Sequence, residues 1–318
     1  MIEGPGRSCP LAYHYGAASF GEPASLRVDT LWIAGGLYGN RNALETLLDL
    51  YADEPGEKAL VFNGDFHWFD VAAEDFLGVN ASVLAHRATR GNVETELAFP
   101  SPGTGCGCAY PEWVGDAEVE RSNRIIERLR ATAAQSPEAV RALATLPMHL
   151  VAEVGGERVA IVHGDADSLA GWSFSQESLA TSAGIEAARA AFARADARVF
   201  ASSHTCLPVL QSVDDGRAVV NNGAAGMPNF AGTRFGLATR ISVRPSTGAL
   251  YSARAAGLHV EARPIRYDHA AWLARFVASW PEGSDAHSSY FARIMNGPRY
   301  PQDAALRPER SIAVPQPA

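Results

Sequence analysis

Four short apolar runs in the chain each end in a turn that carries a residue able to bind a metal. The runs are ALVFNGD, HRATRGN, VAIVHGD and VFASSHTC, and they deliver in order Asp65, Asn92, His163 and His204. A carboxylate, an amide oxygen and two imidazoles can together hold a hard or borderline divalent ion. Alone, each histidine would fit a hydrogen-bonded core residue, Asp65 a helix N-cap and Asn92 a turn residue. The series of four favours metal ligation.

A fifth run comes first in the chain and differs from the others. LWIAGGLYGN, residues 31–40, has the same strand-then-turn pattern, but its turn offers Gly36 and Tyr38 instead of a carboxylate and an imidazole. This first turn decides whether the site has room for one metal or two.

The elements that must position these residues alternate between strand and helix. Residues 30–35 and 59–63 are apolar runs typical of buried strands, and a further strand is expected around 88–90. Between them, residues 40–52 carry leucines at a helical spacing. Short connections of this kind predict an α/β fold with a mainly parallel sheet covered by helices. Ligands bind such sheets beyond the C-terminal ends of the strands, where every motif above falls.

Three other segments surround the predicted core of residues 29–267. Residues 1–28 are expected to form an irregular arm that packs on the core through Tyr13 and Tyr15, and residues 268–318 two helices and a Pro-rich tail. An insertion at about 98–150, a Gly-rich loop followed by two helices, could cap the site. The rest of the core is expected to contain a hairpin around Gly155–Gly156, a helix over 180–195, and strands at 198–202, 218–221, 236–243 and 249–253.

Composition limits the class of protein. The chain has 318 residues, of which 47% are hydrophobic and 19% charged, typical of a globular enzyme. Its formal net charge of −8 argues against a general affinity for nucleic acid but allows a small phosphorylated ligand bound through a metal. No run is apolar enough for a membrane span and no signal peptide is visible, so a cytoplasmic protein is expected. Four cysteines do not make a disulfide framework, and a homo-oligomer is left open.

The order of the motifs resembles a known family. GD (64–65), GN-x-E (91–94), HGD (163–165), SSHTC (202–206) and NNGAAGMP (221–228) resemble the motifs of the calcineurin-like metallophosphoesterases. Within them the small bacterial branch, whose last motifs read GHTH and NPGSVG-x-P, is the most similar. The resemblance covers about residues 30–267 without the insertion. It implies a two-sheet β-sandwich flanked by helices in four αββα layers, a two-metal site at the strand ends, and attack on phosphorus by a metal-bridging hydroxide.

The resemblance also assigns the second metal's ligands. Asp65 matches the bridging aspartate, Asn92 the asparagine, and His163 and His204 the two histidines of that site. Val93 stands where many members carry a leaving-group histidine, which some members of the small branch also lack.

The first metal's ligands are mostly lost. Gly36 stands at the position of an aspartate, Tyr38 at that of a histidine and Cys206 at that of the last histidine. Glycine has no side-chain donor, a neutral tyrosine must lose a proton with a pKa near ~10 before it binds, and a thiolate favours soft metals. We therefore expect one divalent ion (Mn, Fe or Zn) beside a vacated pocket, with a second metal doubtful.

The residues of the vacated pocket have alternative roles. Tyr38 could be an aromatic plug, a hydrogen-bond donor to substrate or a ligand to ferric iron; packing is favoured because tyrosine without support is more often core. Cys206 could be only a small buried hydrophobe.

Several other residues lie near these motifs. His67 could face the site as a third imidazole or a leaving-group acid, or be a partly exposed loop histidine. Asp165 and Asp167 could orient the imidazoles or be solvated loop acids. In the insertion, Cys106 and Cys108 could be a redox pair or a metal clip, but their spacing favours two ordinary thiols. Three polar residues of the following helix could reach a phosphate or line an exposed face: Arg121, Asn123 and Arg124.

Together these features predict metal-dependent hydrolysis of a phosphate mono- or diester by a hydroxide on a single metal, with Asn92 also touching the phosphate. One ion can polarise a phosphoryl oxygen but cannot clamp attacking and leaving oxygens together. Two alternatives remain: a non-catalytic metal- or ligand-binding protein that kept the fold, and a mononuclear iron enzyme of another class.

Overall fold

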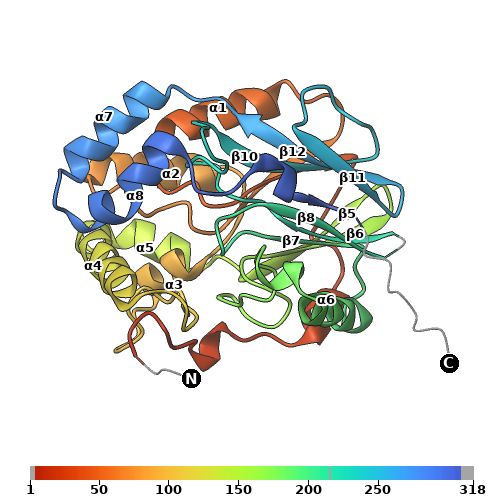
Figure 1. Cartoon of the computed structure of the whole chain (residues 1–318), viewed down its shortest axis with the longest axis horizontal. Coiled ribbons are helices and arrows are strands. Elements are labelled where there is room, and N and C mark those ends of the chain that lie inside the picture. The colour runs from red at the N-terminus through yellow and green to blue at the C-terminus, as the bar shows by residue number, and fades with distance from the viewer. Residues whose placement is uncertain (1–3, 215, 309–318) are drawn as a thin grey trace.

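The computed structural model describes residues 4–214 and 216–308, in which two β-sheets pack face to face between layers of helices (Figure 1). The first sheet has six strands in the order β11-β12-β10-β2-β3-β4. Its strands are β2 (Thr30–Ala34), β3 (Lys58–Asn63), β4 (Arg87–Thr89), β10 (Gly236–Ser242), β11 (Tyr251–Ala255) and β12 (Leu258–Ile265). β2, β3 and β4 run parallel, whereas β10 to β12 add to them as antiparallel neighbours.

The second sheet has seven strands in the order β1-β5-β6-β7-β9-β8-β13. Its strands are β1 (Leu26–Val28), β5 (His149–Val154), β6 (Glu157–Val162), β7 (Val199–Ser202), β8 (Val209–Asp214), β9 (Arg217–Asn221) and β13 (Leu306–Arg307). β5 and β6 form the expected hairpin, since Gly155 and Gly156 both take the positive φ of a tight turn. β6, β7 and β9 are parallel, so the ends of β6 and β7 point to the same edge.

Helices cover the outer faces of both sheets. The six-stranded sheet is covered by α1 (Arg41–Ala52), α2 (Ala73–Leu84), α7 (His269–Ser279) and α8 (Asp285–Asn296), and the seven-stranded sheet by α6 (Ser182–Arg194). The segment predicted as an insertion contains α4 (Asp116–Ala133) and α5 (Pro137–Ala144), which pack on α3 (Asn92–Ala98), and α4 also packs on α8. Short 3₁₀ turns complete the chain at Leu11–Tyr13, Ala17–Gly21, Ser178–Ala180 and Gln302–Ala304.

Strand β2 shows why both faces of the sheet must be apolar. Leu31 and Ile33 point into the core between the two sheets, while Trp32 and Ala34 point to the core under the helices. This alternation is the period of two that a strand imposes on its side chains. A strand buried on both faces therefore appears in the sequence as a continuous apolar run.

The expected two-sheet sandwich flanked by helices is confirmed. The prediction of a mainly parallel sheet is right for β2 to β4 and for β6, β7 and β9, but both sheets are mixed because each also contains antiparallel neighbours. The sequence patterns missed α2, α3, β8 and β12. The arm packs as expected: the hydroxyl groups of buried Tyr13 and Tyr15 donate to Glu96 Oε1 at 2.7 Å and to Asp165 O at 2.6 Å.

Two further points concern the ends of the chain. β1 extends the second sheet from within the predicted arm, and residues 309–318 of the predicted Pro-rich tail lie outside the described residues. No helix in the two described ranges is long and apolar enough to cross a membrane.

Candidate metal centre

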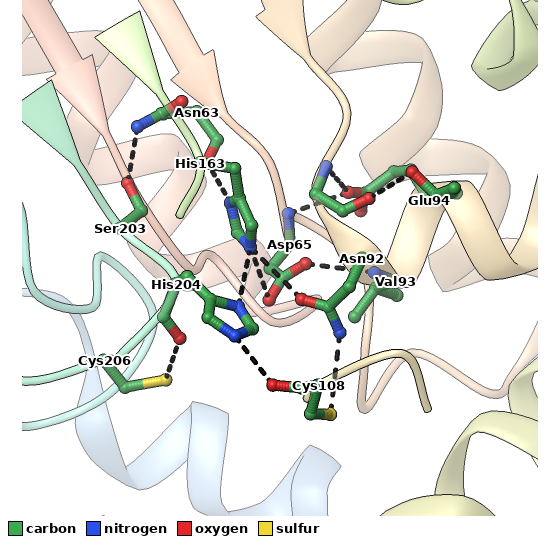
Figure 2. A network of polar contacts seen from close by, with 12 residues as sticks. Asn63, Asp65, Asn92, Val93, Glu94, Cys108, His163, Ser203, His204 and Cys206 are labelled. Atoms are coloured by element: carbon green, nitrogen blue, oxygen red, sulfur yellow. Dashed lines mark hydrogen bonds and ion pairs between the residues drawn. The ribbon is translucent and has the colours of Figure 1, made fainter. Parts of the chain in front are cut away.

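Four side chains from successive strand ends meet at one point (Figure 2). Asp65 follows β3, Asn92 begins α3 after β4, His163 follows β6 and His204 follows β7. Asp65, His163 and His204 are buried, and each offers an atom that lies within 4.8 Å of the other two. Asn92 Oδ1 lies 3.2 Å from His163 Nε2. The structure thus brings together all four residues that the sequence singled out as ligands.

Backbone carbonyls fix the orientation of both imidazoles. His163 Nδ1 donates to Asn63 O at 2.8 Å, and His204 Nε2 donates to Cys108 O at 2.9 Å. The remaining ring nitrogens, His163 Nε2 and His204 Nδ1, then face each other at 3.3 Å. The Asp65 carboxylate lies 3.3 Å from His163 Nε2. Two imidazole lone pairs directed at one another beside a carboxylate fit a divalent cation.

The electrostatics of the cluster also suit a cation. Burial alone would lower the pKa of His163, but the adjacent Asp65 carboxylate outweighs it and raises that pKa. Burial and the neighbouring His163 together lower the pKa of His204 to about 4. Burial disfavours the charged form of Asp65, but the attraction of His163 outweighs it and lowers the pKa of this carboxyl group. At neutral pH the cluster therefore presents an anionic carboxylate and an unprotonated His204.

The two turns that carry Asp65 and Asn92 are held by one buried carboxylate. Glu94 accepts N–H bonds from Asp65 at 2.8 Å, Gly91 at 2.9 Å and His67 at 3.2 Å. Gly91 must be glycine, because a Cβ there would overlap the Asp65 carboxylate. Asp65 itself takes a φ of 52°, a left-handed conformation that few side chains adopt.

We expect Glu94→Ala to destabilise the protein strongly. It leaves three buried N–H groups without an acceptor, each costing about 1–3 kcal/mol, so a total of roughly 3 kcal/mol or more is expected in urea unfolding. Glu94→Gln keeps one acceptor oxygen, so its free energy of unfolding should fall less than that of the alanine variant. Equal stability of the wild type and the alanine variant would contradict this role.

The three residues at the vacated first-metal positions, Gly36 and Tyr38 of the first turn and Cys206 after β7, lie together. Gly36 has a φ of +35°, and a Cβ there would lie 2.5 Å from the Tyr38 hydroxyl oxygen. That hydroxyl lies 2.7 Å from Cys206 Sγ. Burial raises the pKa of Tyr38 well above its usual value, which keeps the phenol neutral. The ring of Tyr38 therefore fills the space that a side chain at position 36 would need.

Three predicted neighbours of the site lie elsewhere. His67 is fully buried, bonds Asp70 Oδ2 through Nδ1 at 2.6 Å and stacks on Phe76, so it does not face the cluster. Asp165 accepts backbone N–H bonds from its own loop rather than from an imidazole. Asp167 forms an exposed ion pair with Arg194. The groups that orient the imidazoles are the carbonyls of Asn63 and Cys108.

The insertion contributes differently from what the sequence suggested. Arg121 bonds Glu118 and Ser289, and Arg124 pairs with Asp285, so both arginines hold helices rather than point at the site. Cys106 and Cys108 form a disulfide, so the favoured interpretation of two ordinary thiols is wrong. Cys9 and Cys206 are free.

A cavity of about 170 Å³ opens beside the cluster. Its walls include Asp65, Asn92, Val93, Tyr38, His204, Thr205, Cys206 and Cys108, together with five residues that the sequence analysis missed: Trp68, Tyr110, Trp172, Tyr290 and Arg293. Arg293 comes from α8, near the end of the chain. A single aromatic or basic residue in a loop or an amphipathic helix has no sequence pattern that shows it will line a cavity.

Comparisons with solved structures identify the fold. No family model matches the chain, and no curated protein matches it. A metallophosphoesterase from Sphaerobacter thermophilus superposes with a TM-score of 0.54 at 18% identity, over 85% of this chain and 100% of that one. A hypothetical protein from Pyrococcus horikoshii superposes with a TM-score of 0.53 at 14% identity, over 86% of this chain and 99% of that one. The chain therefore has the fold of the metallophosphoesterases.

Proposed function

We propose that the protein is a metal-dependent phosphoesterase that holds one divalent ion, Mn, Fe or Zn, on Asp65, Asn92, His163 and His204. The observation that carries this proposal is the pair of inward-facing imidazole nitrogens, 3.3 Å apart beside the Asp65 carboxylate. The likeness to a metallophosphoesterase supports the reaction class. When bound, such an ion polarises a phosphoryl oxygen and lowers the pKa of a water molecule.

The residues of the chain supply binding and orientation. Arg293 lines the cavity and is positioned by bonds to Pro228 O at 3.2 Å and Cys206 O at 3.0 Å. A guanidinium has five N–H donors, so donors remain for a phosphate. Asn92 turns its Oδ1 toward the cluster because its Nδ2 donates to Cys106 O at 2.9 Å. We assign Arg293 to the phosphate and Asn92 chiefly to the metal.

The first turn makes the site mononuclear in this proposal. Tyr38 fills the space beside Gly36, and its neutral hydroxyl bonds Cys206 rather than pointing to Asp65 as a ligand would. This contact supports the aromatic plug over the ferric ligand. His67 takes no part in the reaction, because it is enclosed by Asp70 and Phe76.

Activity assays with added metal test this function. Chromogenic phosphomonoesters and phosphodiesters should be hydrolysed by the wild type in the presence of Mn²⁺, Zn²⁺ or Fe²⁺ and not after chelation. His14→Ala, at an exposed histidine far from the motifs in sequence, serves as the control and should keep full activity. If no ester is hydrolysed although the metal binds, the protein is a metal-binding protein that kept the fold.

A further inference from the structure

The Gly-rich loop of the insertion lies against the metal cluster and contains the Cys106–Cys108 disulfide. Gly107, between the two cysteines, has a φ of +67°, and Gly105 and Ala109 on either side also take positive φ values. Cys106 is fully buried, whereas Cys108 forms part of the cavity wall. A thiol that enters the cavity therefore meets Cys108 first.

Both disulfide-bonded residues hold a proposed metal ligand through their backbone, and Figure 2 shows the contact of Cys108 with His204. Asn92 Nδ2 donates to Cys106 O at 2.9 Å, and His204 Nε2 donates to Cys108 O at 2.9 Å. Trp172 Nε1 shares the second carbonyl at 3.1 Å. The loop thereby turns Asn92 Oδ1, rather than Nδ2, and His204 Nδ1, rather than Nε2, toward the cluster. Outer partners of this kind tune the affinity of a metal site.

The loop is anchored on both sides of the disulfide: Trp172 bonds Cys108 O, and two further bonds hold the Cys106 side. Cys106 N donates to Asn123 Oδ1 at 2.9 Å, and Gly105 O accepts from Arg130 at 3.0 Å. The disulfide ties Cys108 back to this anchor. Because it links residues only two positions apart, it constrains the unfolded chain little and adds little stability as a staple. Its consequence is local: it fixes the relative position of the two carbonyls.

We propose that Cys106–Cys108 is a redox-active disulfide whose reduction weakens the metal site. A dithiol reductant attacks Cys108 Sγ as its thiolate, which breaks the S–S bond, forms a mixed disulfide and releases Cys106 as a thiolate that takes up a proton. The second thiol of the reductant then displaces Cys108, which also takes up a proton. Two electrons and two protons thus pass to the protein, and the reductant becomes a cyclic disulfide.

The consequence for metal binding rests on the function proposed above, whereas the redox step does not. In the reduced loop, Cys108 O keeps its bond from Trp172 but is no longer held by the S–S bond to Cys106, so the partner of His204 is less firmly fixed. Loss of an outer partner typically weakens metal affinity by about 10–100-fold. We expect Mn²⁺ to bind roughly tenfold more weakly after reduction and to regain its affinity on reoxidation.

The test uses the full chain before and after treatment with dithiothreitol. Alkylation and mass spectrometry should find Cys9 and Cys206 free at first and all four cysteines free afterwards. Calorimetry measures the Kd for Mn²⁺ in each state, and nitrogen NMR follows the His204 Nε2–H signal without any metal. The variant Cys106→Ser/Cys108→Ser should bind Mn²⁺ with the Kd of the reduced protein, and dithiothreitol should not change that Kd. In Cys9→Ser, dithiothreitol should weaken Mn²⁺ binding as it does in the wild type.

The outcomes separate the two proposals. Four free thiols before reduction, or the same Kd and the same His204 signal in both states, would overturn the inference. If Mn²⁺ binds neither state, the proposed function fails, and the His204 signal alone decides whether the disulfide controls this imidazole. If the double serine variant does not fold, Cys106→Ala, which also prevents the disulfide, replaces it in the same comparison.

Discussion

Replacing His163 with alanine is expected to abolish metal binding and any phosphoesterase activity. His163 Nε2 lies at the centre of the cluster, within 3.3 Å of a potential metal-ligand atom on each of Asp65, Asn92 and His204. Loss of an outer partner already costs about 10–100-fold in affinity, so loss of the ligand itself should exceed roughly 100-fold. Metal content after dialysis and the Kd for Mn²⁺ measure this effect.

His67→Gln is the matched control for that experiment. His67 is as buried as His163 and also lies beside a carboxylate, Asp70, but it does not reach the cluster. This variant should keep its metal and its activity even if it is less stable. Unchanged metal content in His163→Ala would refute the site assignment, and equal losses in both variants would show that the metal loss reflects unfolding.

The second large effect concerns the contact between Gly36 and Tyr38. Gly36→Ala should destabilise the protein by roughly 2–4 kcal/mol, because the new Cβ overlaps the buried phenol and the residue has a positive φ. A double-mutant cycle with Tyr38→Ala isolates this contact. In the Tyr38→Ala background, Gly36→Ala should lower the free energy of unfolding by roughly 1–2 kcal/mol less, since the overlap is gone. Urea unfolding of the four proteins in the cycle measures this interaction.

Gly35→Ala provides the control for the cycle. A Cβ at Gly35 would clash with Ser203 rather than with Tyr38. Its cost should therefore be the same with and without the Tyr38 side chain. If Gly36→Ala costs equally in both backgrounds, Tyr38 does not fill the space beside position 36, and the explanation of the mononuclear site is lost.

The convergence of the four proposed ligands could be predicted from sequence because each is local to a strand end. A buried strand followed by a turn has a clear pattern, and parallel strands bring their ends to one edge, so Asp65, Asn92, His163 and His204 were placed together correctly. Helix α3 was missed because it is only seven residues long and its residues are buried up to Leu97, so it has no amphipathic period.

The surroundings of the ligands could not be predicted in the same way. Asn63 O and Cys108 O orient the imidazoles. Every residue has a backbone carbonyl, so the sequence does not show which of them will bond a histidine. Asp165 lies two residues after His163 in HGD, yet its side chain turns to its own loop. Arg293 reaches the cavity only because α8 packs against α4, a contact between segments far apart in the chain.

The most direct test of a single metal site is a crystal structure grown with saturating Mn²⁺, with the ions located by their anomalous scattering. We predict one ion, bound by Asp65, Asn92, His163 and His204, with the Tyr38 ring beside Gly36. Two ions, an ion bound by Tyr38 and Cys206, or no ion at the four ligands would contradict it.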